Sequence, residues 1–367
     1  MNENHLMEKR IYSLPESFTT LIEEKLKRYN LSLSNSKKIA DAVLFMSDFY
    51  INNPQLATPW NERYTWIAQL AYYFPLNYLR NHAVIQEMKR HFHIQNFSKI
   101  VDYGSGLGTS SWCFQNEKLN SPIFQFETEI KLKNYWDTAP FYWLPNSESL
   151  LLKIDRNTLG VFSYSLTEVN DSLSLLEKFN YLMILEPSTQ SDGRKLMQLR
   201  KELIQKGYHI AAPCVHQEDC PLLEKSKKDW CHDRIHFQKP DWFQKLENQL
   251  PIKNETITFS YLIAYKKNQR GKIVKSPTPS THLFAPSGTK SEPSDLQLAR
   301  LTGDLLNEKG KSRQLVCYNS DRMFFTWLHK QIKPQEIGRG TLVSIPKDVT
   351  FLSNELRLHP DSKIEVT

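Results

Sequence analysis

Residues 99–109 read KIVDYGSGLGT, and this stretch predicts the fold. A hydrophobic strand ends at Asp102, a glycine-rich loop follows, and a helix begins after the loop. Glycine suits a loop that turns tightly and lets a ligand approach too closely for a Cβ. Backbone amides at the start of the helix are placed to bind a carboxylate. The predicted ligand-binding residues of the loop are Asp102, Gly104, Ser105, Gly106 and Gly108.

A second apolar strand, IFQFE, ends in Glu127, 19 residues after Gly108. An acid at this distance is placed to accept hydrogen bonds from ribose hydroxyls. Glu129 is the alternative acid. NAD would fit the same geometry, but the loop has the form G-x-G-x-G rather than G-x-G-x-x-G. We therefore predict S-adenosylmethionine (SAM) as the ligand, with another nucleotide or a structural relic as the alternatives.

Short β-rich runs alternate with helical stretches between residues 97 and 265. The runs are KIVDYG (99–104), IFQFE (123–127), LLLKID (150–155), LGVFSY (159–164), YLMILE (181–186), HIAAP (209–213) and FSYLIAY (259–265). Alternation of this kind predicts a mainly parallel sheet covered by helices. We expect an α/β fold of the class I SAM methyltransferase type, Rossmann-like, with a seven-stranded, mostly parallel sheet.

Four segments are expected along the chain. Residues 1–92 read as an N-terminal helical region, with one apolar helix face near Phe18 and another near Ile39. Residues 93–265 form the methyltransferase-like core, with a cysteine insertion at 214–236. Residues 266–296 are rich in Lys, Ser, Thr and Pro and read as a basic linker. Residues 297–367 are expected to form a small C-terminal β unit.

The strand exits that flank the transferred methyl in this fold carry no recognisable catalytic motif. The fourth strand exits as SYSLTE (163–168) and the fifth as EPST (186–189). Neither contains an Asn-Pro-Pro-aromatic turn or a cysteine nucleophile. The catalytic residues are therefore unknown, and whether the protein is an enzyme stays open.

Three of the five cysteines form a C-x5-C-x10-C array just after the sixth predicted strand, at Cys214, Cys220 and Cys231. Clustered thiolates are preferred ligands of zinc and of iron–sulfur clusters. A fourth ligand is needed, and the candidates are Cys317, His216, His232 and His236. Cys113 is expected to be a buried structural cysteine. The spacing leaves zinc and a 4Fe-4S cluster both open.

The formal net charge of +7 favours a polyanionic partner, of which nucleic acid is the commonest. Candidate phosphate contacts are Lys225, Lys227, Lys228, Lys266, Lys267, Arg270, Lys272, Lys275, Arg300, Lys311 and Arg313. Apolar runs long enough for a spanning helix are missing, and the first residues read as neither a signal nor a transit peptide. We therefore expect a cytoplasmic protein of bacterial type with no membrane contact. No DNA partner is expected.

Together these motifs resemble a known family, the methyltransferase-like assembly factors of the small ribosomal subunit. This family includes the mitochondrial methyltransferase-like protein seventeen of animals and bacterial relatives. The stretches that carry the resemblance are FPLNYLRN (74–81), VDYGSGLGT (101–109), SYSLTEV (163–169), LEPSTQSDGR (185–194), APCVHQEDCPL (212–222), DWCHDRIHF (229–237), FSYLIAY (259–265) and the late QLVCYN.

The resemblance implies that Cys317 is the fourth ligand, that the metal is a 4Fe-4S cluster, and that the partner is the small ribosomal subunit or its rRNA. It implies a SAM-binding protein that methylates small-subunit rRNA or assists subunit assembly. Two alternatives remain: a non-catalytic assembly factor with a relic SAM pocket, and a small-molecule methyltransferase with a structural zinc.

Overall fold

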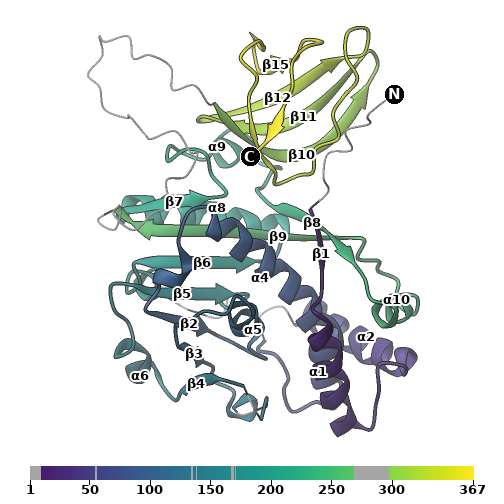
Figure 1. The fold of residues 1–367 in the computed structure, drawn as a ribbon, viewed down its shortest axis with the longest axis vertical. Helices are drawn as coiled ribbons and strands as arrows, with labels where there is room; N and C mark the ends of the chain where they lie inside the picture. The colour runs from purple at the N-terminus through teal and green to yellow at the C-terminus, as the bar shows by residue number, and fades with distance from the viewer. Residues whose placement is uncertain are drawn as a thin grey trace.

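The computed structural model describes residues 10–53, 56–133, 135–137, 139–166, 169, 171–267 and 297–367. In this part of the chain two sheets are packed against one another, a large one flanked by helices and a smaller C-terminal one (Figure 1). The predicted basic linker, 266–296, lies almost wholly outside the described residues. None of the described helices combines the length and apolarity needed to cross a membrane.

The large sheet has nine strands. They are β1 (Ile11–Ser13), β2 (Lys99–Tyr103), β3 (Ile123–Phe126), β4 (Phe141–Leu144), β5 (Thr158–Ser163), β6 (Tyr181–Glu186), β7 (Tyr208–Ala212), β8 (Asp233–Gln238) and β9 (Thr256–Lys266). The order is β1-β8-β9-β6-β5-β2-β3-β4, and β7 also pairs with β9. Strands β2 to β6 run parallel, and β9 is antiparallel to β6 and β7. Leaving aside β1 and β8, this is the class I SAM methyltransferase fold.

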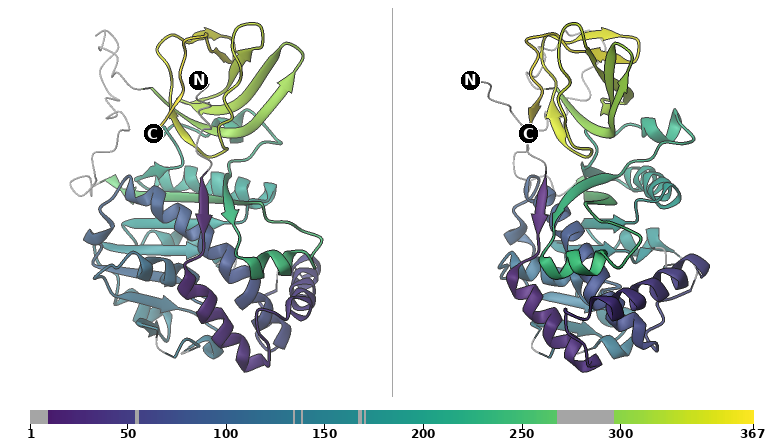
Figure 2. Two further views of the ribbon diagram at one scale, coloured as in Figure 1. Left: turned by 45° about the vertical axis from the view of Figure 1, so that its right-hand side comes forward. Right: turned by 90° about the vertical axis from the view of Figure 1, so that its right-hand side faces the viewer.

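Helices cover both faces of this sheet (Figure 2). They are α1 (Glu16–Leu26), α2 (Ser36–Asn52), α3 (Arg63–Ala68), α4 (Phe74–Lys89), α5 (Thr109–Asn116), α6 (Ser147–Leu151), α7 (Ser172–Leu176), α8 (Gln190–Gln205), α9 (Pro221–Glu224) and α10 (Asp241–Glu247). Short turns of helix lie at η1 (Lys27–Tyr29), η2 (Gln69–Tyr73), η3 (Ile94–Asn96) and η4 (Ile130–Leu132).

Alternate residues of each central strand reach opposite faces of the sheet, as strand geometry requires. In β6, Met183 and Leu185 join the core beneath the N-terminal helices, while Leu182 and Ile184 join a second core beneath α8. The strand is therefore apolar throughout, which explains why the uninterrupted run YLMILE was recognisable as a strand buried on both faces.

The N-terminal helices agree with the predicted apolar faces. Phe18 and Ile22 of α1 are buried in the core, as are Ile39 and Val43 of α2. Helix α2 begins after Asn35. The N-terminal region is not purely helical, because β1 adds a parallel strand to β8 at the edge of the large sheet.

One predicted strand is wrong. Residues 150–155 lie at the end of α6 and in the turn after it, and the strand beside β3 is β4. Asn146 accepts a hydrogen bond from the N–H of Ser149 at 2.8 Å and so caps α6. A cap of this kind starts a helix. Leu151 and Leu152 are exposed, so their run of leucines does not mark a buried strand.

The C-terminal sheet has seven strands, β10 (Leu298–Glu308), β11 (Lys311–Tyr318), β12 (Asp321–Leu328), β13 (Leu342–Ser344), β14 (Thr350–Leu352), β15 (Glu355–Arg357) and β16 (Glu365–Val366). Its order is β14-β15-β12-β11-β10-β13-β16. A core around Val316, Phe325 and Trp327 supports it. A smaller apolar cluster, with Met197 on one side and Phe324 on the other, joins this sheet to the large one.

Candidate functional site

The glycine loop connects β2 to α5. Gly104, Gly106 and Gly108 have φ angles of 64°, 51° and 72°. A Cβ added at Gly104 would lie 2.5 Å from the Cβ of Ser165, at the exit of β5. Glycine is therefore required at position 104 both by the backbone conformation and by the close approach of the neighbouring strand.

Glu127 lies against this loop. Its Oε2 accepts a hydrogen bond from the N–H of Gly106 at 2.9 Å, and its Oε1 accepts one from the N–H of Glu129 at 3.0 Å. The carboxylate of Glu129 points elsewhere, because it accepts from the N–H of Lys131 at the start of η4. Of the two acids considered from the sequence, Glu127 is the one that the fold brings to the loop.

Asp102 is buried behind the loop. Its Oδ2 accepts hydrogen bonds from the N–H of Ser111 at 3.1 Å and from its hydroxyl at 2.7 Å. Burial raises the pKa of Asp102 to about 7, although these hydrogen bonds act in the opposite direction. The described contacts of Asp102 hold the first turn of α5 in place, so it supports the loop from behind.

Two serine hydroxyls beside Gly104 are buried without a partner. Ser105 follows this glycine, and Ser165 packs against it; neither hydroxyl has a hydrogen bond within the described part of the chain. An unsatisfied buried hydroxyl costs about 1–3 kcal/mol. A polar ligand seated on the loop would remove that cost.

The residues at the end of β5 contact the neighbouring helix α4. Ser163 accepts a hydrogen bond from the side-chain amide of Asn81 at 3.0 Å. Tyr164 has a φ of 60°, its pKa is raised by burial, and its ring faces the guanidinium of Arg80 at 6.0 Å. Thr167 and Glu168 lie outside the described residues. The described contacts of Ser163 and Tyr164 are thus with Asn81 and Arg80.

The four predicted metal ligands line one cavity between the two sheets. Cys214, Cys220 and Cys231 come from the segment between β7 and β8, and Cys317 comes from β11 of the C-terminal sheet. Counted together with the solvent-open space at its mouth, this cavity has a volume of about 510 Å³. Among the described residues, however, no group of three or more His, Cys, Asp or Glu side chains is arranged to hold a metal ion.

Burial dominates the electrostatics of these thiols. It raises the pKa of Cys220, Cys231 and Cys317, and the neighbouring sulfurs raise it further. The Sγ of Cys317 lies 3.5 Å from Nε2 of His216. Burial also lowers the pKa of His216 to about 4, which keeps its imidazole neutral at pH 7.

The other candidate ligands lie outside this cavity. The ring of His232 stacks on Trp230 with centroids 5.1 Å apart, and His236 pairs through its backbone with β1. Cys113 is buried in α5 and donates to the carbonyl of Tyr78, which agrees with a structural role.

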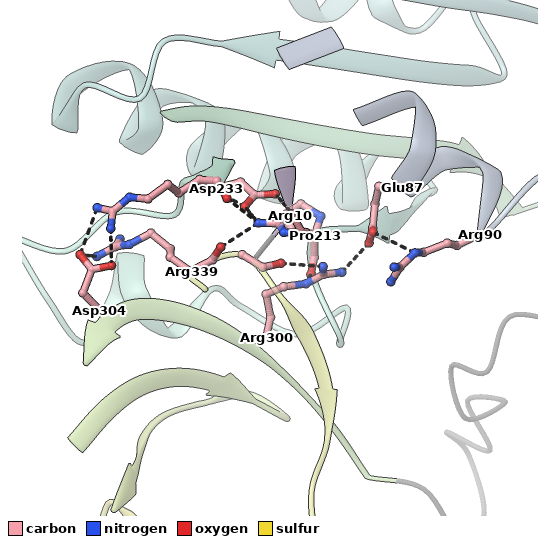
Figure 3. A network of polar contacts seen from close by, with 10 residues as sticks. Arg10, Glu87, Arg90, Pro213, Asp233, Arg300, Asp304 and Arg339 are labelled. Carbon is pink, nitrogen blue, oxygen red and sulfur yellow. Dashed lines mark hydrogen bonds and ion pairs between the residues drawn. The ribbon is translucent and has the colours of Figure 1, made fainter. Parts of the chain in front are cut away.

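A network of arginines and carboxylates fastens the C-terminal sheet beside the cavity (Figure 3). Arg300 of β10 is buried and donates to Glu87 of α4 at 2.7 Å and to the carbonyls of Pro213 and Gly340. Arg300 holds the pKa of Glu87 well below its usual range, although burial acts in the opposite direction.

The same network extends to the N-terminal residues. Arg10 pairs with Asp233 at the start of β8 and donates to the carbonyl of Arg339 at 2.8 Å. Asp304 of β10 pairs with Arg234 at 2.7 Å. The network thus joins residues from the beginning, the middle and the end of the described chain (Figure 3).

The prediction that Arg300 contacts phosphate is wrong, because this side chain is only 4% exposed and is paired with Glu87. Three further candidates are already paired: Lys225 with Asp321, Lys311 with Glu355 and Arg313 with Glu308. Lys227, Lys228 and Lys267 are exposed. Lys266 donates to the carbonyl of Glu177 at 2.9 Å. Arg270, Lys272 and Lys275 lie outside the described residues.

Arg200 is a cavity residue that the sequence analysis missed. It lies in α8 with Leu196, Met197 and Leu203, all of which are buried. A charged residue within such an apolar stripe was the available signal, since an arginine on a buried helix face needs a polar or anionic partner.

The cavity and the glycine loop are separate places. Strands β5, β6 and β9 lie between β2 and β7 in the sheet. Four strand spacings amount to roughly 19 Å. The cysteine segment and the glycine loop both follow the carboxyl end of a strand, but the two sites do not share a pocket.

Comparison with known proteins gives one family match. The model of the family described as mitochondrial small ribosomal subunit Rsm22 matches residues 146–299. This range is less than half of the chain and includes Cys214, Cys220 and Cys231. No curated protein sequence matches the chain.

Solved structures resemble the chain weakly. A putative RNA methyltransferase from Pyrococcus horikoshii is 10% identical, with 53% of this chain and 83% of that chain covered and a TM-score of 0.31. A SAM-dependent methyltransferase from Archaeoglobus fulgidus is 12% identical, with 56% and 100% covered and a TM-score of 0.33. A tRNA methyltransferase from Bacillus subtilis is 11% identical, with 51% and 65% covered and a TM-score of 0.29.

Proposed function

We propose that this protein is a SAM-binding, methyltransferase-like factor that acts on the small ribosomal subunit, either on its rRNA or on its assembly. We propose further that Cys214, Cys220, Cys231 and Cys317 hold a 4Fe-4S cluster. The observation that carries this proposal is the position of Cys317. It comes from a different sheet, yet it lines the same cavity as the other three thiols.

The lining of the cavity supports this proposal. Each thiolate of a 4Fe-4S centre binds a different iron, so the four sulfurs surround a larger space than the ligands of a single zinc ion do. Apolar side chains such as Leu196 and Leu222 line the rest of the wall and limit the access of water. A bound cluster would supply iron–thiolate bonds that tie the C-terminal sheet to the core.

SAM is proposed for the glycine loop. The carboxylate of Glu127, which already accepts from the N–H of Gly106, is proposed to accept also from the ribose hydroxyls. The N–H groups of Gly104, Ser105, Gly106 and Gly108 already have protein acceptors, so the methionine carboxylate is not assigned to them. The buried hydroxyls of Ser105 and Ser165 would gain partners from a polar ligand. Gly104, Gly106 and Gly108 are assigned to the same site, with Asp102 supporting α5 behind it.

The ribosomal partner is proposed from the family match over residues 146–299 together with the basic charge of the chain. The description of that family is mitochondrial, which does not clearly match the expected bacterial-type cytoplasmic location. The exposed Lys227 and Lys228, inside the cysteine segment, are proposed phosphate contacts.

A non-catalytic assembly factor is the second candidate. The observation in its favour is the exit of β5, where Ser163 and Tyr164 are engaged by Asn81 and Arg80. Such a protein would retain the fold and the cluster and would transfer no methyl group.

The cluster is tested on the full chain purified without oxygen. We expect about four irons and four sulfides per chain and a brown colour with an absorbance band at about 400 nm. Cys317→Ser should abolish the colour, whereas Cys113→Ser, as the matched control, should leave it unchanged. Zinc in place of iron, or equal colour in both variants, would overturn the cluster.

The two functional candidates are separated with labelled SAM and immature small subunits. Transfer of label to rRNA supports the methyltransferase. Accumulation of immature subunits in a deletion strain with unchanged rRNA methylation supports the assembly factor. Labelled SAM that does not bind to the full chain would overturn the proposed use of the glycine loop.

A further inference from the structure

Arg200 is a buried cation in the wall of the cysteine cavity. Its side chain extends from α8 and is only 2% exposed. Its Nε donates to the Sγ of Cys214 at 3.0 Å, and its Nη2 donates to the carbonyl of His216 at 2.9 Å. Both partners belong to the cysteine segment that follows β7.

The positive charge of Arg200 is not neutralised by a carboxylate. Within the described part of the chain, no Asp or Glu oxygen lies within the 4.0 Å of an ion pair with its guanidinium. Arg300, the other arginine of this cavity, is paired with Glu87. A buried charge without a counter-charge is costly by several kcal/mol. The anion that compensates Arg200 must therefore lie in the cavity itself.

We infer that Arg200 is a positioning residue for the metal centre, which orients the sulfur of Cys214 and supplies the positive charge that offsets the thiolate ligands. This inference rests on the proposed cluster. An arginine N–H that donates to a ligating sulfur stabilises the more negative, reduced state of the centre. Removing the charge should therefore make reduction harder and release of the metal faster.

The same helix offers a matched control. Arg194 lies in α8 and donates to the carbonyls of Leu223, Ser226 and Asp229, which belong to the same cysteine segment. In these hydrogen bonds Arg194 anchors the segment through backbone carbonyls and not through a sulfur. Arg194→Gln therefore measures the cost of loosening the segment, and Arg200→Gln measures that cost together with the loss of the charge at the sulfur.

The test uses the full chain loaded without oxygen with ferrous iron and sulfide. Iron content, reduction potential and the rate of iron loss to a chelator are measured for both variants. We expect Arg200→Gln to shift the potential to more negative values and to speed iron loss by about 10–100-fold. Arg200→Lys, which keeps the charge but not the planar fork, should give an intermediate potential. Arg194→Gln should keep the wild-type potential in its loaded fraction.

The outcomes separate this inference from the cluster. If the wild type loads and Arg200→Gln has the same potential and iron-loss rate as Arg194→Gln, Arg200 has no positioning role and only this inference fails. Should Arg200→Gln not fold, a wild-type potential together with a wild-type iron-loss rate in Arg200→Lys would show that the planar fork of Arg200 does not position Cys214. A wild-type chain that binds neither iron nor zinc would overturn the cluster and this inference together. If the wild-type chain binds zinc alone, the proposal of a 4Fe-4S cluster is wrong. The role of Arg200 is then tested by comparing the rates of zinc loss in Arg200→Gln and Arg194→Gln.

Discussion

The glycine loop and the cysteine cavity lie at the same edge of one sheet but are built in opposite ways. The loop and its acid come from residues 102–127, within a single strand–helix–strand unit, and the hydrogen bonds of Asp102 and Gly106 stay inside it. Two further bonds come from residues shortly after it, from Glu129 to Glu127 and from Trp136 to the carbonyl of Leu107. The cavity needs Glu87 of α4, Arg200 of α8 and Cys317 of β11. The first site is local, whereas the second exists only when both sheets are docked. Damage to the interface should therefore remove the proposed metal binding and spare the proposed SAM binding.

The largest expected effect comes from Arg300→Met. This variant leaves the buried carboxylate of Glu87 without its main partner, and breaking a buried pair in this way costs about 3–5 kcal/mol. Arg90→Met is the control, because Arg90 is more exposed and lies 3.6 Å from the same carboxylate. Its loss should cost less than about 1 kcal/mol. Urea unfolding measures both, and equal losses would show that the interface does not depend on the buried pair.

Gly340→Ala should be the next most damaging change. The added Cβ would collide with the carboxylate of Asp233, which Arg10 holds in place. Gly310→Ala is the control, since Gly310 has a similar φ of 84° and open space around it. In both variants an alanine in the left-handed backbone region costs about 1–2 kcal/mol of stability, and only Gly340→Ala adds the collision. Thermal unfolding should rank them in this order, with iron content reduced only in Gly340→Ala.

Gly104→Ala tests the local site. The Cβ would press against Ser165, so the loop must move, and we expect SAM affinity to fall by about 10-fold or more, equivalent to about 1.4 kcal/mol. Gly207→Ala has the same kind of backbone cost, at a φ of 85°, far along the chain from the loop. Equilibrium dialysis with labelled SAM should detect the loss in the first variant alone. Unchanged iron content in Gly104→Ala would confirm that the two sites are independent.

The smallest effect is a pH dependence inside the local site. Burial raises the pKa of Asp102 to about 7 in the folded protein, whereas an aspartate in the unfolded chain has a pKa of about 3.9. As the pH falls from 8 to 6, the folded protein therefore binds a proton at Asp102 and the unfolded chain does not. Stability should therefore increase by about 1 kcal/mol as the pH falls from 8 to 6. Asp102→Asn should lose this increment in denaturant titrations at the two pH values. An identical increment in the variant would rule Asp102 out as its source.

The contrast also explains what could be predicted from the sequence. The glycine loop and Glu127 were recognisable because a positive φ and a strand-terminal acid leave local signatures. Residues 150–155 were mistaken for a strand because a run of leucines looks alike in a buried strand and in a short helix whose cap, Asn146, lies outside the run. The strands β1 and β8 were missed because each is stabilised by pairing with a distant segment rather than by its own pattern.

The roles of the buried arginines could not be predicted from the sequence, because their partners lie on other elements of the fold. Arg300 looked like one basic residue among many near the late cysteine, and only the docking of β10 against α4 places it beside Glu87. Arg200 carried a weak signal in its apolar helix face, but its sulfur partner lies 14 residues further along the chain. Charge counted along a sequence cannot tell a solvated cation from one that is neutralised across an interface.

The position of Cys317 within β11, between β10 and β12, has a consequence for how the chain matures. Protein synthesis delivers the first three thiols long before the fourth, and this fourth thiol is held at the cavity only once its own strands have paired. A nascent or prematurely ended chain would carry a finished glycine loop but just three sulfurs. The proposed centre could thus bind metal through all four thiols only after β12 has been synthesised and the C-terminal sheet has folded.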